Sequence, residues 1–302
     1  MFKRLLVLLD GSPLAETALP VAASLAHLTH ADVTLLHIIE RNAPTEVHNV
    51  RHLANVDEAG TYLDEVAQRS FPASLHVDNH VHTSAVDDVA RSIVEHAVEL
   101  RSDLIVMCAH GHGGPRRFLF GSNAQQIIAL GKTPVLLIPP RLSGTTPEFN
   151  CRRILVPLDG NPDHEQGLPV AIDLAQTCQA AIHLVEVVPK RETLTDEKAA
   201  TGKLLPLTTT ALLDMQQRDA GSYLQNQIAK IQTAGVSVSA EVSRGDPVTT
   251  VVEAAKQAGA DLIVLGTHGK TGLDAFWSGS ITPRVLEQSS TPLLLVRIQP
   301  SG

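Results

Sequence analysis

Two aspartates follow short apolar runs, where a carboxylate could serve a bound ligand. Asp10-Gly11 comes after Leu5–Leu9, and Asp159-Gly160 comes after Ile154–Leu158. A carboxylate in such a place can accept hydrogen bonds from ribose hydroxyls. Most Asp-Gly pairs after a strand are only turns, so the two aspartates indicate a binding site only when a second feature supports them.

That second feature is a glycine-rich turn in the second half of the chain. Gly266-Thr267-His268-Gly269 is followed by nine residues and then by Gly279-Ser280. Glycines let the backbone approach a polyphosphate closely. We expect Ser280 and Ile281 to open a helix, whose N–H groups and dipole favour an anion. With Asp159 for the sugar and apolar strands for the base, the turn predicts a nucleotide site.

Two other phosphate-binding motifs are excluded. Gly269-Lys270-Thr271 would complete a P-loop only with a glycine at position 264, where Val264 stands inside an apolar run. The dinucleotide fingerprint GxGxxG should follow the first strand, and Asp10–Pro13 does not supply it.

Five segments of the first half return in the same order in the second half. The pairs are Lys3–Gly11 and Arg152–Gly160, Asp103–Val106 and Asp261–Val264, His110-Gly111 and His268-Gly269, Gly121-Ser122 and Gly279-Ser280, and Thr133–Leu137 and Thr291–Leu295. This repeat predicts two domains, residues 1–141 and 151–302, joined by a polar linker over residues 142–150. The second copy also carries an insert near Pro189–Asp219, which we expect to be a surface loop or helix.

Within each half, apolar runs of four to seven residues alternate with helical spacing. Leu14–Leu28, for example, has apolar residues three or four apart, and it lies between the runs Leu5–Leu9 and Val33–Ile39. This alternation is typical of an α/β fold, a doubly wound and mainly parallel sheet with helices on both faces. Ligands of such sheets bind outside the carboxyl ends of the strands, which would bring the Asp-Gly turn and the glycine-rich turn together.

The second half resembles the ATP-binding signature of the universal stress protein family, GxxG-(x)9-G(S/T). The matching residues are Gly266-x-x-Gly269, nine residues and Gly279-Ser280, with Asp159 earlier in the chain. The resemblance covers nearly the whole chain. It implies two five-stranded sheets with strand order 3-2-1-4-5, in tandem. It also implies a stress-response protein that binds ATP, ADP or AMP, with Mg²⁺ as a further candidate. The family uses the last strand in dimer contacts, which this chain could form internally or in a homodimer.

The resemblance also implies roles for individual residues. Pro157, Asp159 and Val187, the last through its backbone, would line the adenine and ribose pocket. Leu265, Gly266, His268 and Gly269 would hold ribose and phosphate, and Gly279, Ser280, Ile281 and Thr282 would cradle the phosphates. The weaker counterparts in the first half are Asp10, Ile38, His110, Gly111, Gly121 and Ser122.

The first half departs from the signature at several positions. Cys108 replaces the first glycine, Leu8 replaces the proline at Pro157, and Asn123 and Ala124 replace Ile281 and Thr282. A Cβ at Cys108 would not fit if that position needs positive φ or a close backbone approach. We therefore expect the first site to bind nucleotide weakly or to be regulatory.

Three classes of function compete. A binding and signalling module is favoured, because no nucleophile is paired with a base and no acidic cluster could hold two metal ions. A slow ATPase or phosphotransferase would have to depend on Asp159, Mg²⁺ and Lys270. Metal binding through His76, His80 and His82 is the third class, although no cysteine or carboxylate cluster accompanies these histidines.

Composition narrows the partners and the compartment. The net charge of −8 argues against non-specific binding to nucleic acid or to an anionic membrane surface. No apolar run approaches the ~20 residues of a membrane span, and the apolar run after Arg4 is too short for a signal peptide. The three cysteines have no CxxC spacing, so we expect free thiols and a cytoplasmic location.

Overall fold

The computed structural model describes residues 1–41, 46–47, 50–109, 121–140, 149–194, 200, 204–268 and 281–298. Its contacts divide the chain into two compact units. Unit 1 contains Met1–Asn150, Thr267–Ser280 and Pro292–Arg297, and unit 2 contains Cys151–Gly266, Ile281–Thr291 and Ile298–Gly302. Most of the expected linker, residues 142–148, lies outside the described residues.

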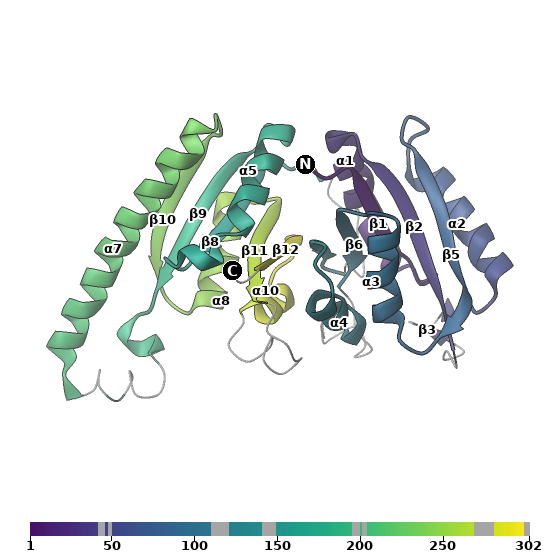
Figure 1. Ribbon diagram of the computed structural model, residues 1–302. Helices are drawn as coiled ribbons and strands as arrows, with labels where there is room; N and C mark the ends of the chain where they lie inside the picture. Colours follow the sequence, from purple (N-terminus) through teal and green to yellow (C-terminus); the bar gives the residue numbers. More distant parts are fainter. Residues whose placement is uncertain are drawn as a thin grey trace. The chain divides into compact units, whose positions relative to one another are not determined.

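Unit 1 alternates strands and helices along the chain (Figure 1). Its elements are β1 (Arg4–Leu8), a 3₁₀ turn (Ala15–Ala18), α1 (Leu19–Thr29), β2 (Asp32–Glu40), β3 (Glu46–Val47), β4 (Val50–Arg51), α2 (Val56–Ser70), β5 (Val77–Val86), α3 (Val89–Glu99), β6 (Leu104–Cys108), α4 (Ser122–Leu130) and β7 (Val135–Ile138).

The sheet of unit 1 has the order β5-β2-β1-β6-β7, which is the expected order 3-2-1-4-5 when these strands are counted along the chain. All of these neighbours are parallel. Every residue of β6 and β7 is buried, as expected for parallel strands covered on both faces. The doubly wound α/β fold is thereby confirmed. Unit 1 also includes most of β12 (Leu293–Ile298), which pairs with β7 in antiparallel direction.

The helices of unit 1 pack in two pairs, α1 with α2 and α3 with α4. One boundary differs from the expected helix over Leu14–Leu28. A 3₁₀ turn comes first, with the N–H of Ala15 donating to Ser12 Oγ, and α1 begins only at Leu19. Pro20 explains the late start, because a proline lacks the N–H of a helix interior and is tolerated in the first turn.

Unit 2 repeats this plan. Its elements are β8 (Arg153–Leu158), a 3₁₀ turn (Pro162–His164), α5 (Gly167–Cys178), β9 (Ala181–Val188), a 3₁₀ turn (Arg191–Thr193), α7 (Pro206–Thr233), β10 (Val238–Arg244), α8 (Pro247–Ala258), β11 (Leu262–His268, whose last two residues fall in unit 1) and α10 (Thr282–Gln288). Its strands have the parallel order β10-β9-β8-β11, the same arrangement as the first four strands of unit 1.

Part of the expected insert is helical. The 28-residue helix α7 begins at Pro206, inside the predicted segment, and continues to Thr233. Within the described residues, no helix has both the length and the apolar composition needed to cross a bilayer.

A repeated aspartate fastens the central strand of each unit. The carboxylate of Asp103, just before β6, accepts hydrogen bonds from the backbone N–H groups of Lys3 (2.7 Å) and Arg4 (3.0 Å). In unit 2, Asp261 accepts from the N–H groups of Arg152 (2.7 Å) and Arg153 (2.9 Å). These contacts give the repeated Asp-Leu-Ile-Val segments a structural purpose, because they hold the amino ends of neighbouring parallel strands together.

We predict that Asp103→Ala and Asp261→Ala each lower the free energy of unfolding by about 1 kcal/mol, since two backbone donors lose a charged acceptor at a solvated edge. Denaturant titration followed by circular dichroism measures the change. Asp173→Ala, at an exposed position of α5, is the matched control. Equal stability of all three variants would contradict the fastening role.

Candidate functional site

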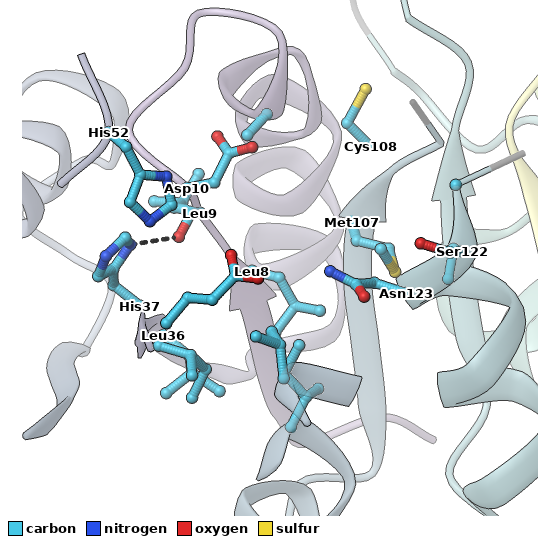
Figure 2. A pocket seen from close by; sticks show the side chains of 17 residues that line it. Leu8, Leu9, Asp10, Leu36, His37, His52, Met107, Cys108, Ser122 and Asn123 are labelled. Atoms are coloured by element: carbon cyan, nitrogen blue, oxygen red, sulfur yellow. Dashed lines mark hydrogen bonds between the residues drawn. The ribbon is translucent and has the colours of Figure 1, made fainter. Parts of the chain in front are cut away.

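Unit 1 contains a cavity of about 250 Å³ at the carboxyl ends of β1, β2 and β6, beside the start of α4 (Figure 2). Its lining includes four of the six candidates in the first half, Asp10, Ile38, Gly121 and Ser122. The other two, His110 and Gly111, lie outside the described residues. The remaining lining residues are Leu8, Leu9, Ala15, Leu36, His37, Glu40, His52, Val89, Ile93, Met107, Cys108, Asn123 and Ala124.

Apolar side chains separate two polar ends of this cavity. Figure 2 shows Asp10, His37 and His52 at one end, and Ser122 and Asn123 with Met107 at the other. Parallel pairing explains the gathering, because Leu8 lies opposite Leu36 and the neighbouring Val7 lies opposite Val106 of β6. Three strands therefore end at one edge, where a ligand could contact all of them.

His37 ties three segments together at the polar end. Its ring is buried, with Nδ1 2.9 Å from the carbonyl oxygen of Leu9 and Nε2 2.9 Å from that of Leu53. A neutral imidazole has one N–H and can donate to only one of these carbonyls at a time. The motif analysis missed His37, although a histidine inside the apolar run Val33–Ile39 is a signal that could have identified it.

The Asp10-Gly11 turn packs beneath the same segment. Gly11 has φ +86°, and a Cβ there would lie 2.7 Å from Leu53 Cδ1. The left-handed φ therefore favours glycine here, and any other residue would also displace the end of the Leu53 side chain. Asp10 itself accepts a hydrogen bond from the N–H of Ser12 at 2.8 Å, which fixes the orientation of its carboxylate.

The first turn of α4 faces the other end of the cavity. Its N-cap is Gly121, which has no side chain to cap the backbone N–H groups that follow. Such N–H groups can be satisfied by an anion.

In unit 2, the described candidates lie at the corresponding strand ends. Pro157 belongs to β8, Val187 to β9, and Leu265, Gly266 and His268 to β11, while Asp159 directly follows β8. Gly269, Gly279 and Ser280 lie outside the described residues.

The helix after the glycine-rich turn begins later than expected. Ile281 is its N-cap and Thr282 is its first residue, whereas we expected Ser280 and Ile281 to open it. A proline stands in its first turn, Pro283, and favours a helix start at this place.

Gly266 is needed for a close approach and not for its φ. Its φ is not positive, but a Cβ at this position would lie 2.8 Å from the carbonyl oxygen of His164. Cys108 holds the corresponding place in unit 1, where its φ is not positive either and its Sγ lies 3.2 Å from Thr17 Oγ1. Cys108 therefore does not have the backbone strain that we expected. Its side chain fits in unit 1, where it is buried against Thr17.

Both carboxylate oxygens of Asp159 have a polar contact within unit 2. One oxygen accepts from the N–H of Asn161 (3.1 Å), and the other lies 2.5 Å from His164 Nδ1. Asn161 Nδ2 also lies 3.1 Å from His164 Nε2. His164 was missed by the sequence analysis, because position 15 of the first copy is alanine and the repeat therefore gives no signal.

Glu186 brings a buried carboxyl group to the same end of unit 2. It follows Val185, the strand partner of Pro157, just as His37 follows Leu36, the partner of Leu8. Its Oε2 is buried and has no hydrogen-bond partner among the described residues. Burial, and secondly the nearby Asp159, raise the pKa of Glu186 from 4.5 to about 7.

Helix α7 adds two polar groups near this carboxyl. Tyr223 Oη donates to Glu165 Oε1 at 2.8 Å, and Gln227 Nε2 donates to the same oxygen at 2.7 Å. Burial and the contact with Glu165 raise the pKa of Tyr223, to which Glu186 and Asp159 contribute. The long helix of the insert thus helps to form the polar end of unit 2.

Of the histidines considered for a metal, His80 and His82 lie on β5 and His76 directly precedes it, and all three contact other partners. His76 Nε2 lies 3.1 Å from Asp78 Oδ2, and His82 Nδ1 lies 3.3 Å from His96 Nε2. The ring of His80 lies at a tilt of 57° to that of His96, with ring centroids 4.8 Å apart. Among the residues that the structure describes, no group of three or more His, Cys, Asp or Glu is placed to hold a metal ion.

Comparison with known proteins finds the same duplicated domain. The sequence model of the universal stress protein family matches residues 1–139 and again residues 150–297. A universal stress protein of Mycolicibacterium smegmatis is 26% identical over 304 residues, which cover 97% of this chain and 96% of that protein.

Two solved structures have the same fold over their length. Protein PA1789 of Pseudomonas aeruginosa PAO1, described as functionally unknown, has a TM-score of 0.69 at 17% identity and covers 98% of this chain and 93% of its own. A universal stress protein of Archaeoglobus fulgidus has a TM-score of 0.68 at 17% identity, with 98% of each chain covered. At these identities the likeness supports the fold alone.

We predict that Glu186→Gln raises the Tm at about pH 8 but leaves it nearly unchanged at about pH 4. Because the pKa is about 7 in the folded protein and 4.5 ordinarily, the folded state keeps a proton that the unfolded state has lost. Wild-type stability therefore falls as the pH rises through this interval, and the glutamine, which mimics the protonated acid, removes that loss. Glu253→Gln, at an exposed position of α8, is the control. An equal change of Tm at both pH values would contradict the raised pKa.

Proposed function

Because the chain belongs to the universal stress protein family, with two copies of its domain in tandem, we propose that this stress-response protein binds adenine nucleotides. ATP is the proposed ligand, with ADP and AMP as related ones. The observation that carries the proposal is the cavity of unit 1, which gathers Asp10, Ile38, Gly121 and Ser122 at the carboxyl ends of the strands.

The chemistry of the cavity suits the parts of a nucleotide. Leu8, Leu36 and Ile38 offer an apolar wall for the base, and Asp10 offers an acceptor for ribose hydroxyls. The phosphates would lie over the first turn of α4, against its backbone N–H groups. A volume of about 250 Å³ would enclose the base and sugar, with the phosphates toward the opening.

The charged residues that line the unit 1 cavity affect how phosphates could be bound. Asp10 and Glu40 are acidic, and neither Lys nor Arg is among the described lining residues. Phosphates would therefore rely on backbone N–H groups, and Mg²⁺ bound to them would offset the acidic groups. The described lining residues offer no ligand set for the ion, so the nucleotide itself would carry it.

We propose the second site at the corresponding end of unit 2. It would use Asp159, the backbone of Val187, Leu265, Gly266 and His268, with Ile281 and Thr282 at the start of α10. Gly269, Gly279 and Ser280 complete the signature in sequence. Because this copy retains the full signature, we infer that it binds ATP more tightly than unit 1.

Binding rather than turnover is the proposed activity, with nucleotide occupancy changing the protein's conformation or association. A homodimer, a cytoplasmic location and the absence of nucleic-acid binding stay predictions.

Asp10→Ala and Asp159→Ala should each weaken ATP binding at one site about 10-fold or more, because a charged acceptor for the sugar is lost. Isothermal titration calorimetry on the full chain should find two sites in the wild type, and Asp159→Ala should remove the tighter one. Asp173→Ala is the control. The proposal is wrong if the wild type binds no adenine nucleotide, or if the double variant binds as well as the wild type.

A slow hydrolase is a second candidate, favoured by the Asp159–His164 pair at 2.5 Å. A carboxylate that orients an imidazole is a common arrangement for a general base. To activate a water molecule, His164 Nε2 would have to exchange its contact with Asn161 Nδ2 for that water. A rate of phosphate release above about 1 s⁻¹ lies within the ordinary enzyme range.

His164→Ala separates the two functions. If the protein is an enzyme, this variant should lose phosphate release while keeping ATP affinity. Release from the wild type at or below the level of a buffer blank would rule out the hydrolase.

A further inference from the structure

His52 lies at the polar end of the unit 1 cavity and has no hydrogen-bond partner among the residues that the structure describes. Figure 2 shows its ring beside His37 and Asp10. Both ring nitrogens are buried, and neither meets a donor or acceptor among the described residues. Leaving such groups unpaired costs free energy, so a bound ligand that pairs with them would recover it.

The charge state of His52 limits what it can recognise. Burial and the neighbouring His37 lower the pKa of His52, while Glu40 and Asp10 oppose the shift. The ring is therefore neutral at pH 7, with one N–H donor and one lone pair. A neutral imidazole suits an uncharged group that can both donate and accept, such as a hydroxyl.

The backbone beside His52 is anchored from two sides. His37 Nε2 contacts the carbonyl oxygen of Leu53 at 2.9 Å. The side chain of Leu53 packs against Gly11, and a Cβ at Gly11 would displace it. His52 is thus placed in advance next to the Asp10-Gly11 turn, and little ordering would be needed when a ligand binds.

We propose that His52 is a specificity-determining residue of unit 1, which hydrogen-bonds to a ribose hydroxyl of the nucleotide bound beside Asp10. The proposal rests on the proposed function. It extends beyond the family signature, because His52 lies outside the GxxG-(x)9-G(S/T) motif and outside the repeated segments. Asp10 would bind the sugar as a charged acceptor, and His52 would bind it as a neutral partner.

The test compares two ligands on two proteins. All measurements use the full chain with Asp159→Ala, so that unit 1 dominates the calorimetric signal. His52→Ala should weaken ATP binding about 10-fold, the loss expected for one or two hydrogen bonds to a neutral group. With 2′,3′-dideoxyATP, which lacks the hydroxyls, the same substitution should change affinity by less than about 2-fold.

Two further variants separate recognition from folding. His52→Asn keeps one donor and one acceptor and should retain part of the ATP affinity lost in His52→Ala. His76→Ala, directly before β5 and outside the described cavity lining, should bind both ligands like the parent. Circular dichroism should give the same Tm for the parent and for His52→Asn within about 2 °C, because the ring nitrogens of His52 have no partner among the described residues.

The pH profile adds a readout that a structural role would not move. Protonation removes the lone pair of His52, so ATP affinity should fall as the pH drops below the ordinary histidine value of 6.5. Asp10, Glu40 and His37 also face this ring and can titrate, so the dependence attributed to His52 is the part that disappears in His52→Asn. A proton-dependent loss of equal size in both proteins would count against the proposal.

Failure of this inference can be told apart from failure of the proposed function. If the Asp159→Ala chain binds no adenine nucleotide, the unit 1 site is wrong and the role of His52 falls with it. If that chain binds ATP but His52→Ala does not weaken binding, only the role of His52 is wrong. If the loss is the same with ATP and with dideoxyATP, the sugar assignment is overturned.

Discussion

Parallel pairing of the central strand with both neighbours is the constraint on which the candidate sites depend. In unit 1, β1 lies between β2 and β6, and in unit 2, β8 lies between β9 and β11. Parallel strands need crossover connections, here helices. After each strand the chain therefore returns to the edge where the strands begin before the next strand starts. The residues that follow the strands must then meet at the opposite edge, however far apart they are in sequence.

The two copies keep this constraint and change the chemistry that it positions. Where unit 1 has His37, with a backbone carbonyl oxygen 2.9 Å from each ring nitrogen, unit 2 has Glu186, whose Oε2 has no hydrogen-bond partner in the described part of the chain. Where unit 2 needs Gly266 to admit the carbonyl of His164, unit 1 has room for Cys108. The two units therefore share one fold, but the residues at the carboxyl ends of their strands differ in charge and in hydrogen bonding.

The apolar runs were enough to predict the strands of both units, because parallel strands covered on both faces have few polar residues. The strand order needed the family resemblance, since a run such as Leu104–Cys108 carries no sign of which neighbour it will join. Helix starts were less predictable. Pro20 and Pro283 stand in the first turns of α1 and α10, and each favours a helix start there because proline lacks a backbone N–H. This local effect decided where the two helices begin.

The candidate site was predictable only where a motif marked it. Asp10 and Gly121 stood out because their segments repeat, and both line the cavity of unit 1. His52 and His164 have no counterpart in the other copy and no characteristic spacing. Their importance arises from burial and from contacts with distant residues, which depend on the folded chain and leave no periodic trace in the sequence.

The aspartates at the amino ends of the strands have a consequence for how such a protein can change. Asp103 and Asp261 align neighbouring strands through backbone donors at one edge of the sheet, while the cavity of unit 1 lies at the other edge. Alignment and recognition are thereby assigned to separate ends of the same strands. A lineage, or a designer, can therefore exchange the residues of the ligand edge for a new specificity while the opposite edge continues to hold the sheet in register.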